Sequence, residues 1–208
     1  AKFDKWEPIK DTDLEISTDA MRQAYDGLND GLRESLHLAF DRIKAFHEKQ
    51  LPKSWIDFEK NGTILGQKVT PMDKAGLYIP GGKAAYPSSL LMNAIPAIVA
   101  GVDEIIVCTP TPNNEPNELL LAACHLCGIK KVFKVGGASA IAAMAYGTQS
   151  IPKVDVITGP GNIFVATAKK LVFGEVNIDM IADPSEIGIL ADENANSKYL
   201  AIDLLSQA

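Results

Sequence analysis

The stretch VDVITGPGNIFVATAKKLV, residues 154–172, decides the predicted fold. Its first five residues predict a buried strand, and Ile163–Val172 predict a helix, with Gly159-Pro160-Gly161-Asn162 as the turn between them. Glycines let a backbone approach a ligand closely, and the free N–H groups at a helix start favour phosphate. The turn lacks the Gly-x-Gly-x-x-Gly fingerprint and the acidic residue that accompanies it. A tight structural turn and a cofactor-binding turn both remain open on this pattern.

The same succession of strand, turn and helix recurs toward the amino end. Strands are predicted at 104–108 and 131–135, and helices at 88–100, 115–127 and 138–146. This alternation requires right-handed crossovers and a parallel sheet, so the predicted fold class is α/β and doubly wound. Ligands of such sheets bind at the carboxyl ends of strands, where Gly136-Gly137-Ala138-Ser139 lies with the same ambiguity as the first turn.

The segments on either side of this region have a different pattern of predicted helices and strands, which suggests a second domain. Residues 1–50 have helical periodicity, and residues 54–78 read as short strands with a hairpin signal at Asn61-Gly62. A last strand pair is predicted at 177–180 and 186–191, before an apolar helix-like end. The changes near residues 78 and 186 predict an inserted α/β lobe, 78–186, within a discontinuous first lobe, 1–77 plus 187–208.

Composition narrows the class of protein. The 208 residues are 47% hydrophobic and 22% charged, values typical of a globular chain. The net charge of −6 argues against a nucleic-acid surface or an anionic membrane as partner. The apolar runs are too short for a membrane span. Three cysteines, an odd number, favour a reducing compartment.

Metal-ligand and catalytic patterns are weak in this sequence. Cys124-His125-Leu126-Cys127 offers two soft zinc ligands, but no second pair follows, so buried helix cysteines are the favoured interpretation. His37 and His47 lie ten residues apart on a predicted helix and therefore face different sides. We identify no general base paired with an orienting group, and predict no catalytic residue in this segment.

Three single residues are ambiguous on pattern alone. Tyr78 precedes Gly81-Gly82, and its ring could stack on a base or simply pack, with packing favoured. Ser185 lies in a turn at the start of a predicted strand, where its hydroxyl could reach a ligand. Gln207, in the last helical pattern, would pass as a surface amide.

Together, however, the segments carry a specific resemblance. The motifs are GLYIPGG (76–82), LM (91–92), AIPA (94–97), FKVGGA (133–138), AIAA (140–143), AYGT (145–148), VD (154–155), GPGN (159–162), IDM (178–180), PSE (184–186) and DLLSQA (203–208). In number and order they resemble the histidinol dehydrogenase family along essentially the whole chain. The resemblance implies two Rossmann-like, aldehyde-dehydrogenase-like lobes, one inserted in the other, with an N-terminal helical segment.

The resemblance also implies an activity and a set of site residues. Family members oxidise L-histidinol to L-histidine through L-histidinal in the cytoplasm, as homodimers, with two NAD in turn and one zinc ion. It places Tyr78, Ser139 and Asn162 at cofactor-binding positions. It places Ser185 at a substrate-binding position, and Gln207 at a position that binds both zinc and substrate.

The sequence departs from the family pattern in two informative ways. Ser139 replaces a glutamine that usually contacts the cofactor, and Asp183 adds negative charge before the PSE motif, so both departures are unfavourable to cofactor binding. Family members are also longer, with the catalytic Glu-His pair and the other zinc ligands beyond Gln207. The chain is therefore expected to be roughly the N-terminal half of such an enzyme and inactive alone. A non-catalytic nucleotide-binding α/β module is the alternative.

Overall fold

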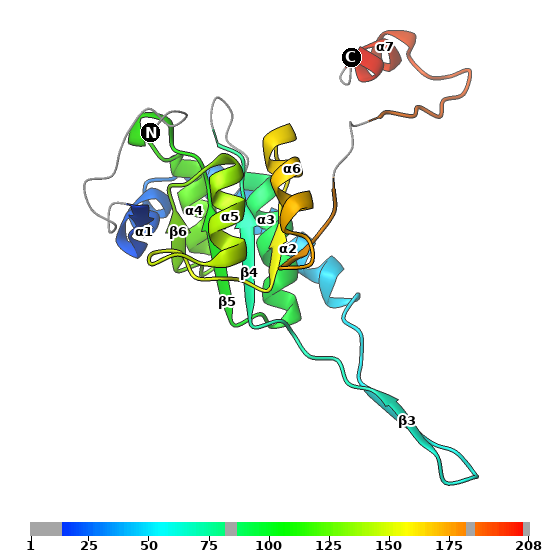
Figure 1. The fold of residues 1–208 in the computed structure, drawn as a ribbon. Coiled ribbons are helices and arrows are strands. Elements are labelled where there is room, and N and C mark those ends of the chain that lie inside the picture. Colours follow the sequence, from blue (N-terminus) through cyan, green and yellow to red (C-terminus); the bar gives the residue numbers. More distant parts are fainter. Residues whose placement is uncertain (1–13, 82–86, 182–185, 206–208) are drawn as a thin grey trace.

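A six-stranded sheet forms the centre of the computed structural model, which describes residues 14–81, 87–181 and 186–205 (Figure 1). The strand order is β1-β6-β5-β4-β7-β8. The strands are β1 (Glu15–Ile16), β4 (Lys74–Tyr78), β5 (Glu104–Cys108), β6 (Lys131–Phe133), β7 (Val156–Thr158) and β8 (Asn177–Ile178). All neighbours pair in parallel except β1, which is antiparallel to β6 at the edge. The predicted parallel α/β sheet is confirmed.

The direction of winding reverses beside β4. The chain passes from β4 to β5 and β6 on one side, then returns to add β7 and β8 on the other. Leu77 of β4 pairs with Val107 of β5 and with Thr158 of β7, so β4 is fully enclosed. The sheet is doubly wound and Rossmann-like, and its topological switch point lies between β4 and β7.

Helices cover both faces of the sheet because strand side chains alternate between two cores. Leu77, Val107 and Val132 face a core built with α1 (Thr18–Asp26), α2 (Asp30–Glu48), α3 (Pro87–Ala100) and α4 (Glu118–Leu126). Tyr78, Cys108 and Phe133 face the other core, built with α5 (Gly137–Tyr146) and α6 (Ile163–Val172). Within the described ranges, no helix has the length and apolar character that a membrane crossing requires.

A two-stranded hairpin extends away from this body (Figure 1). β2 (Trp55–Phe58) and β3 (Ile64–Gln67) pair antiparallel around the predicted turn at Asn61-Gly62. Its large apolar side chains are at least half exposed, or nearly so, on both faces: Trp55, Ile56, Phe58, Ile64 and Leu65. An isolated two-stranded hairpin is only marginally stable in water. Because its side chains are exposed in the described chain, they bury little apolar surface and stabilise the hairpin little.

The last helix, α7 (Ser197–Leu205), lies away from the sheet (Figure 1). The strand predicted at 186–191 is wrong: this stretch has no regular structure, and Leu190 is fully exposed. A strand needs a partner for its N–H and C=O groups, and no strand in the described residues lies beside it. The division into lobes at residues 77/78 and 186/187 remains a prediction, and β4 continues across the first boundary.

Candidate active site at the switch point

Tyr78 ends β4 at the switch point, and the turn after β7 packs directly against it. Gly159 follows β7 with φ +118°, a conformation that favours glycine. A Cβ at Gly159 would lie 2.0 Å from the Tyr78 carbonyl oxygen, so only glycine permits this approach. The sequence-predicted turn and Tyr78 are therefore brought together.

The Tyr78 side chain also reaches the neighbouring turn. Its ring is buried, 4% exposed, so the packing interpretation is confirmed and an exposed stacking ring is wrong. Its hydroxyl accepts a hydrogen bond from the Gly137 N–H at 3.2 Å. Gly137 begins α5 and has φ +64°. Tyr78 thus joins the turn after β6 to the turn after β7.

Ser139 lies in the first turn of α5, where it is exposed. The N-cap residue of this helix is Gly136, whose lack of a side chain leaves the cap without a side-chain hydrogen bond. The first N–H groups of a helix attract anions when no side chain satisfies them. Ser139 therefore stands beside backbone donors at the same edge of the sheet as Tyr78.

Asn162 is the N-cap of α6 and is exposed to solvent. Its side-chain Oδ1 accepts hydrogen bonds from the N–H groups of Phe164 at 3.1 Å and Val165 at 3.2 Å. Because the helix uses this oxygen, the Nδ2 group is what Asn162 can offer to a ligand. An amide donor suits ribose hydroxyls and phosphate oxygens.

An ion pair formed by a buried lysine behind this turn was missed by sequence reasoning. Lys169 of α6 is 3% exposed and pairs with Asp179, which follows β8. The available signal was periodicity, because Lys169 occupies an inward position of the helix together with Val165 and Val172. A lysine buried at such a position requires an ionic partner.

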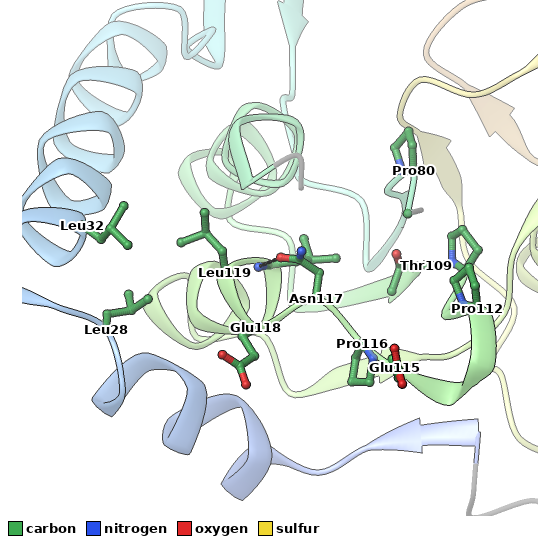
Figure 2. A pocket seen from close by; sticks show the side chains of 13 residues that line it. Leu28, Leu32, Pro80, Thr109, Pro112, Glu115, Pro116, Asn117, Glu118 and Leu119 are labelled. Carbon is green, nitrogen blue, oxygen red and sulfur yellow. Dashed lines mark hydrogen bonds between the residues drawn. The ribbon is translucent and has the colours of Figure 1, made fainter. Parts of the chain in front are cut away.

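A pocket of about 470 Å³ lies nearby, at the carboxyl ends of β4 and β5 (Figure 2). Its lining residues are Leu28, Leu32, Pro80, Gly81, Thr109, Pro110, Pro112, Glu115, Pro116, Asn117, Glu118, Leu119 and Leu120. Figure 2 shows Pro80 and Thr109 on one side and the start of α4 on the other. The pocket is large enough for part of a small-molecule ligand, but Tyr78, Ser139 and Asn162 do not line it.

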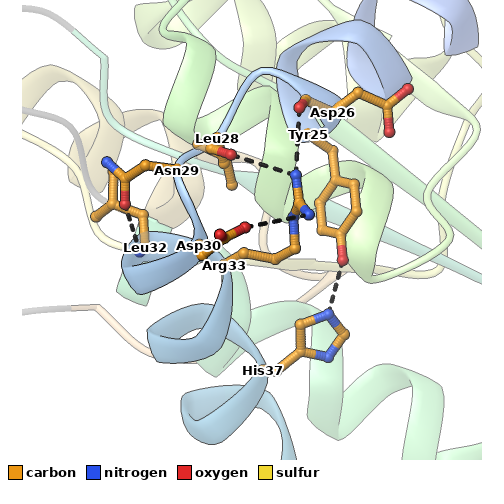
Figure 3. A network of polar contacts seen from close by, with 8 residues as sticks. All are labelled: Tyr25, Asp26, Leu28, Asn29, Asp30, Leu32, Arg33 and His37. Atoms are coloured by element: carbon orange, nitrogen blue, oxygen red, sulfur yellow. Dashed lines mark hydrogen bonds and ion pairs between the residues drawn. The ribbon is translucent and has the colours of Figure 1, made fainter.

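The histidines form packing contacts instead of a metal site. The Tyr25 hydroxyl and the His37 Nε2 are 2.7 Å apart, and Arg33 lies over the Tyr25 ring (Figure 3). The His125 ring also packs against Tyr25, with the two ring centroids 5.1 Å apart. His47 interacts with Gln50 through its Nδ1. Among the described residues, no group of three His, Cys, Asp or Glu side chains could hold a metal ion.

The cysteines are buried, as predicted. Cys124 lies in α4, Cys127 at its C-cap and Cys108 in β5, and all three are free. Burial raises the pKa of Cys108 and of Cys127 to about 12, and burial together with the neighbouring Cys127 also raises the pKa of Cys124. Protonated thiols are poor metal ligands and nucleophiles, so the segment Cys124–Cys127 contributes to the core.

Ser185 and Gln207, the candidate substrate and zinc residues, lie outside the described residues. The structure therefore brings together Tyr78, the Ser139 helix start and the Asn162 turn, and leaves the other two positions as predictions.

Comparison with known proteins gives a consistent result. The family model for histidinol dehydrogenase matches residues 1–208. The chain is 75% identical to a histidinol dehydrogenase of Sulfurimonas denitrificans and 76% identical to one of Wolinella succinogenes, with 100% of this chain and 48% of each relative covered. A crystal structure of histidinol dehydrogenase from Elizabethkingia anophelis superimposes with a TM-score of 0.91 at 39% identity, covering 100% of this chain and 48% of that one. The chain thus spans about half the length of the relatives it matches, and it belongs to the histidinol dehydrogenase family.

Proposed function

We propose that this chain is part of an enzyme that oxidises L-histidinol to L-histidine through L-histidinal, with NAD as the acceptor. The observation that carries the proposal is the contact at the switch point, where Gly159 packs on Tyr78 at the carboxyl ends of β4 and β7. In doubly wound sheets this crevice is the preferred ligand site. Family membership then selects the reaction.

The residues at the switch point fit a dinucleotide. Two glycine turns allow close backbone approach, and the start of α5, which has no side-chain cap, supplies N–H groups for phosphate oxygens. Asn162 would donate from Nδ2, and Ser139 would contact the cofactor over a shorter reach than the glutamine it replaces. Bound NAD supplies the hydride acceptor, while these residues bind and orient it.

Zinc dependence is supported by the family resemblance and not by the described residues. The described residues supply no ligand set, so they do not fit a zinc ion by themselves. We propose Gln207 as one ligand, with Ser185 and Gln207 contacting the substrate. The remaining ligands and the proton-transfer pair would come from the other half of the relatives' length. On this view the chain alone is inactive, and the complete protein is a cytoplasmic homodimer built from the two lobes, 1–77 plus 187–208 and 78–186.

A non-catalytic nucleotide-binding module is the second candidate. Ser139 and Asp183 favour it, because one shortens a cofactor contact and the other adds negative charge that is unfavourable to the cofactor pyrophosphate. The two candidates differ in turnover, since both would bind nucleotide.

The test is stoichiometric turnover by the complete protein. Oxidation of an alcohol to a carboxylate removes two electron pairs, so each L-histidinol consumed should yield two NADH. A chelator should abolish the reaction, and added zinc should restore it. NADH binding without any histidinol-dependent turnover would reject the enzyme and support the binding module.

A further inference from the structure

Lys169 is a buried cation next to the candidate cofactor turn. Its side chain is 4% exposed, and its Nζ donates to the Gly159 carbonyl oxygen at 3.1 Å. Burying an ammonium group is costly unless it is paired and hydrogen-bonded. An apolar side chain at this inward position of α6 would pack without that cost. The presence of a lysine therefore indicates a role other than filling the core.

Asp179 completes the arrangement from the adjacent strand. Its Oδ2 accepts the Gly159 N–H at 2.9 Å, and its Oδ1 accepts the Met180 N–H at 2.7 Å and pairs with Lys169. A single ion pair thus binds both the N–H and the C=O of Gly159. This fixes the two peptide planes on either side of a residue whose φ is +118°.

The fixed glycine sets the direction in which the chain enters α6. Asn162 lies three residues later and caps α6, the same helix that carries Lys169. The ion pair therefore links the first residue of the turn to the helix that follows the turn. The contact between Gly159 and the Tyr78 carbonyl holds the turn 159–162 against the end of β4.

We infer that Lys169 and Asp179 are positioning residues, which hold the turn 159–162 in the shape that binds the cofactor. The inference rests on the proposed NAD site and deepens it, because neither residue is placed in contact with NAD. Preorganised binding elements lose affinity when their supporting contacts are removed, even where the contact residues stay in place.

The test uses the complete protein with both charges replaced, Lys169→Met together with Asp179→Asn. The double change avoids an unpaired buried charge, and the introduced amide would retain an acceptor for the Gly159 N–H. We expect the NADH dissociation constant, measured by fluorescence titration, to rise about tenfold. Amide exchange in peptides covering residues 159–165 of the ligand-free protein should accelerate about tenfold. The KM for NAD should rise more than the KM for L-histidinol.

Lys153→Met with Glu175→Gln is the matched control. This exposed pair joins the residues before β7 to those before β8, at the opposite end of the same two strands. Its removal should leave NADH affinity within about twofold of wild type, as expected for a surface ion pair. A purely structural role for Lys169 would lower the melting temperature while the folded fraction bound NADH normally.

The outcomes separate the inference from the function on which it rests. Binding of NADH by the wild type, with unchanged affinity in the folded Lys169→Met/Asp179→Asn variant, would overturn the positioning role alone. A wild-type protein that does not bind NADH would overturn the proposed function and the positioning role with it. Weaker binding in the variant, with the control unchanged, would support both.

Discussion

Gly159 carries the strongest conformational demand at the candidate site. The substitution Gly159→Ala is unfavourable for two reasons. The φ of +118° strains any residue with a side chain, and the added Cβ would lie 2.0 Å from the Tyr78 carbonyl oxygen. We expect the free energy of unfolding to fall by about 4 kcal/mol, from backbone strain and overpacking combined. Gly174→Ala is the control, because Gly174 has φ +100° with open space around it, and should cost about 1–2 kcal/mol. Equal losses in chemical denaturation would contradict the close contact.

The buried thiols make stability depend on pH. Burial raises the pKa of Cys108 to about 12, whereas a thiol in the unfolded chain ionises near its ordinary value of about 9. The unfolded state therefore loses the proton first, and stability falls as pH rises between these values. In Cys108→Ala the decline should be shallower by about 1 kcal/mol per pH unit, measured by urea unfolding from pH 9 to 11. An identical slope in both proteins would show that this thiol ionises in the folded state.

Ser139 is the residue at which cofactor affinity should be improvable. It is exposed in the first turn of α5, so a longer side chain meets no packed neighbour. Ser139→Gln restores the amide that the family resemblance places here, and should lower the NADH dissociation constant about threefold, the value of a solvated hydrogen bond. Ser139→Ala should change it little. Unchanged binding in the glutamine variant would place Ser139 away from the cofactor.

At the scale of elements, Asn162 combines a structural and a binding role that substitutions can separate. Asn162→Ala removes the cap of α6 and should cost about 1 kcal/mol of stability as well as NADH affinity. Asn162→Asp keeps an acceptor for the Phe164 and Val165 N–H groups but brings negative charge to the site. It should therefore retain stability and lose affinity.

Asn29→Ala provides the matched control for this pair. Asn29 caps α2 through the Leu32 N–H at 2.9 Å and does not line the pocket, so its loss should destabilise the protein to a similar extent. NADH affinity should stay unchanged. If Asn162→Asp bound NADH as tightly as wild type, Asn162 would be a helix cap only.

The same elements show which features the sequence could predict and which it could not. The strand at 104–108 and the helix at 163–172 are predictable from local pattern, because buried strands and amphipathic helices leave a periodic signal. The stretch 186–191 has the pattern of a strand but no partner in the described residues, and pairing is not a local property. The bonds from Lys169 and Asp179 to Gly159 join positions up to 20 residues apart, so pattern alone could not reveal them.

At the scale of the whole molecule, the site lies where topology places it. Tyr78, Ser139 and Asn162 are far apart in sequence, yet the reversal of winding beside β4 brings their elements to one edge of the sheet. The carboxyl-end placement of the two glycine turns was predictable from the strand and helix order. Which strands are neighbours was not, since the order β6-β5-β4-β7-β8 is decided by long-range packing of the two helical layers.

The measurement that tests the central claim most directly is histidinol-dependent NADH formation with added zinc. It should be run on the 208-residue chain and on the chain extended through the other half of the relatives' length. We predict turnover in the extended chain and none in the 208-residue chain, because the proton-transfer pair and most zinc ligands are expected in that other half. Absence of turnover in a folded extended chain would contradict the assignment as an enzyme, and turnover in the 208-residue chain would show that its own residues carry the catalysis.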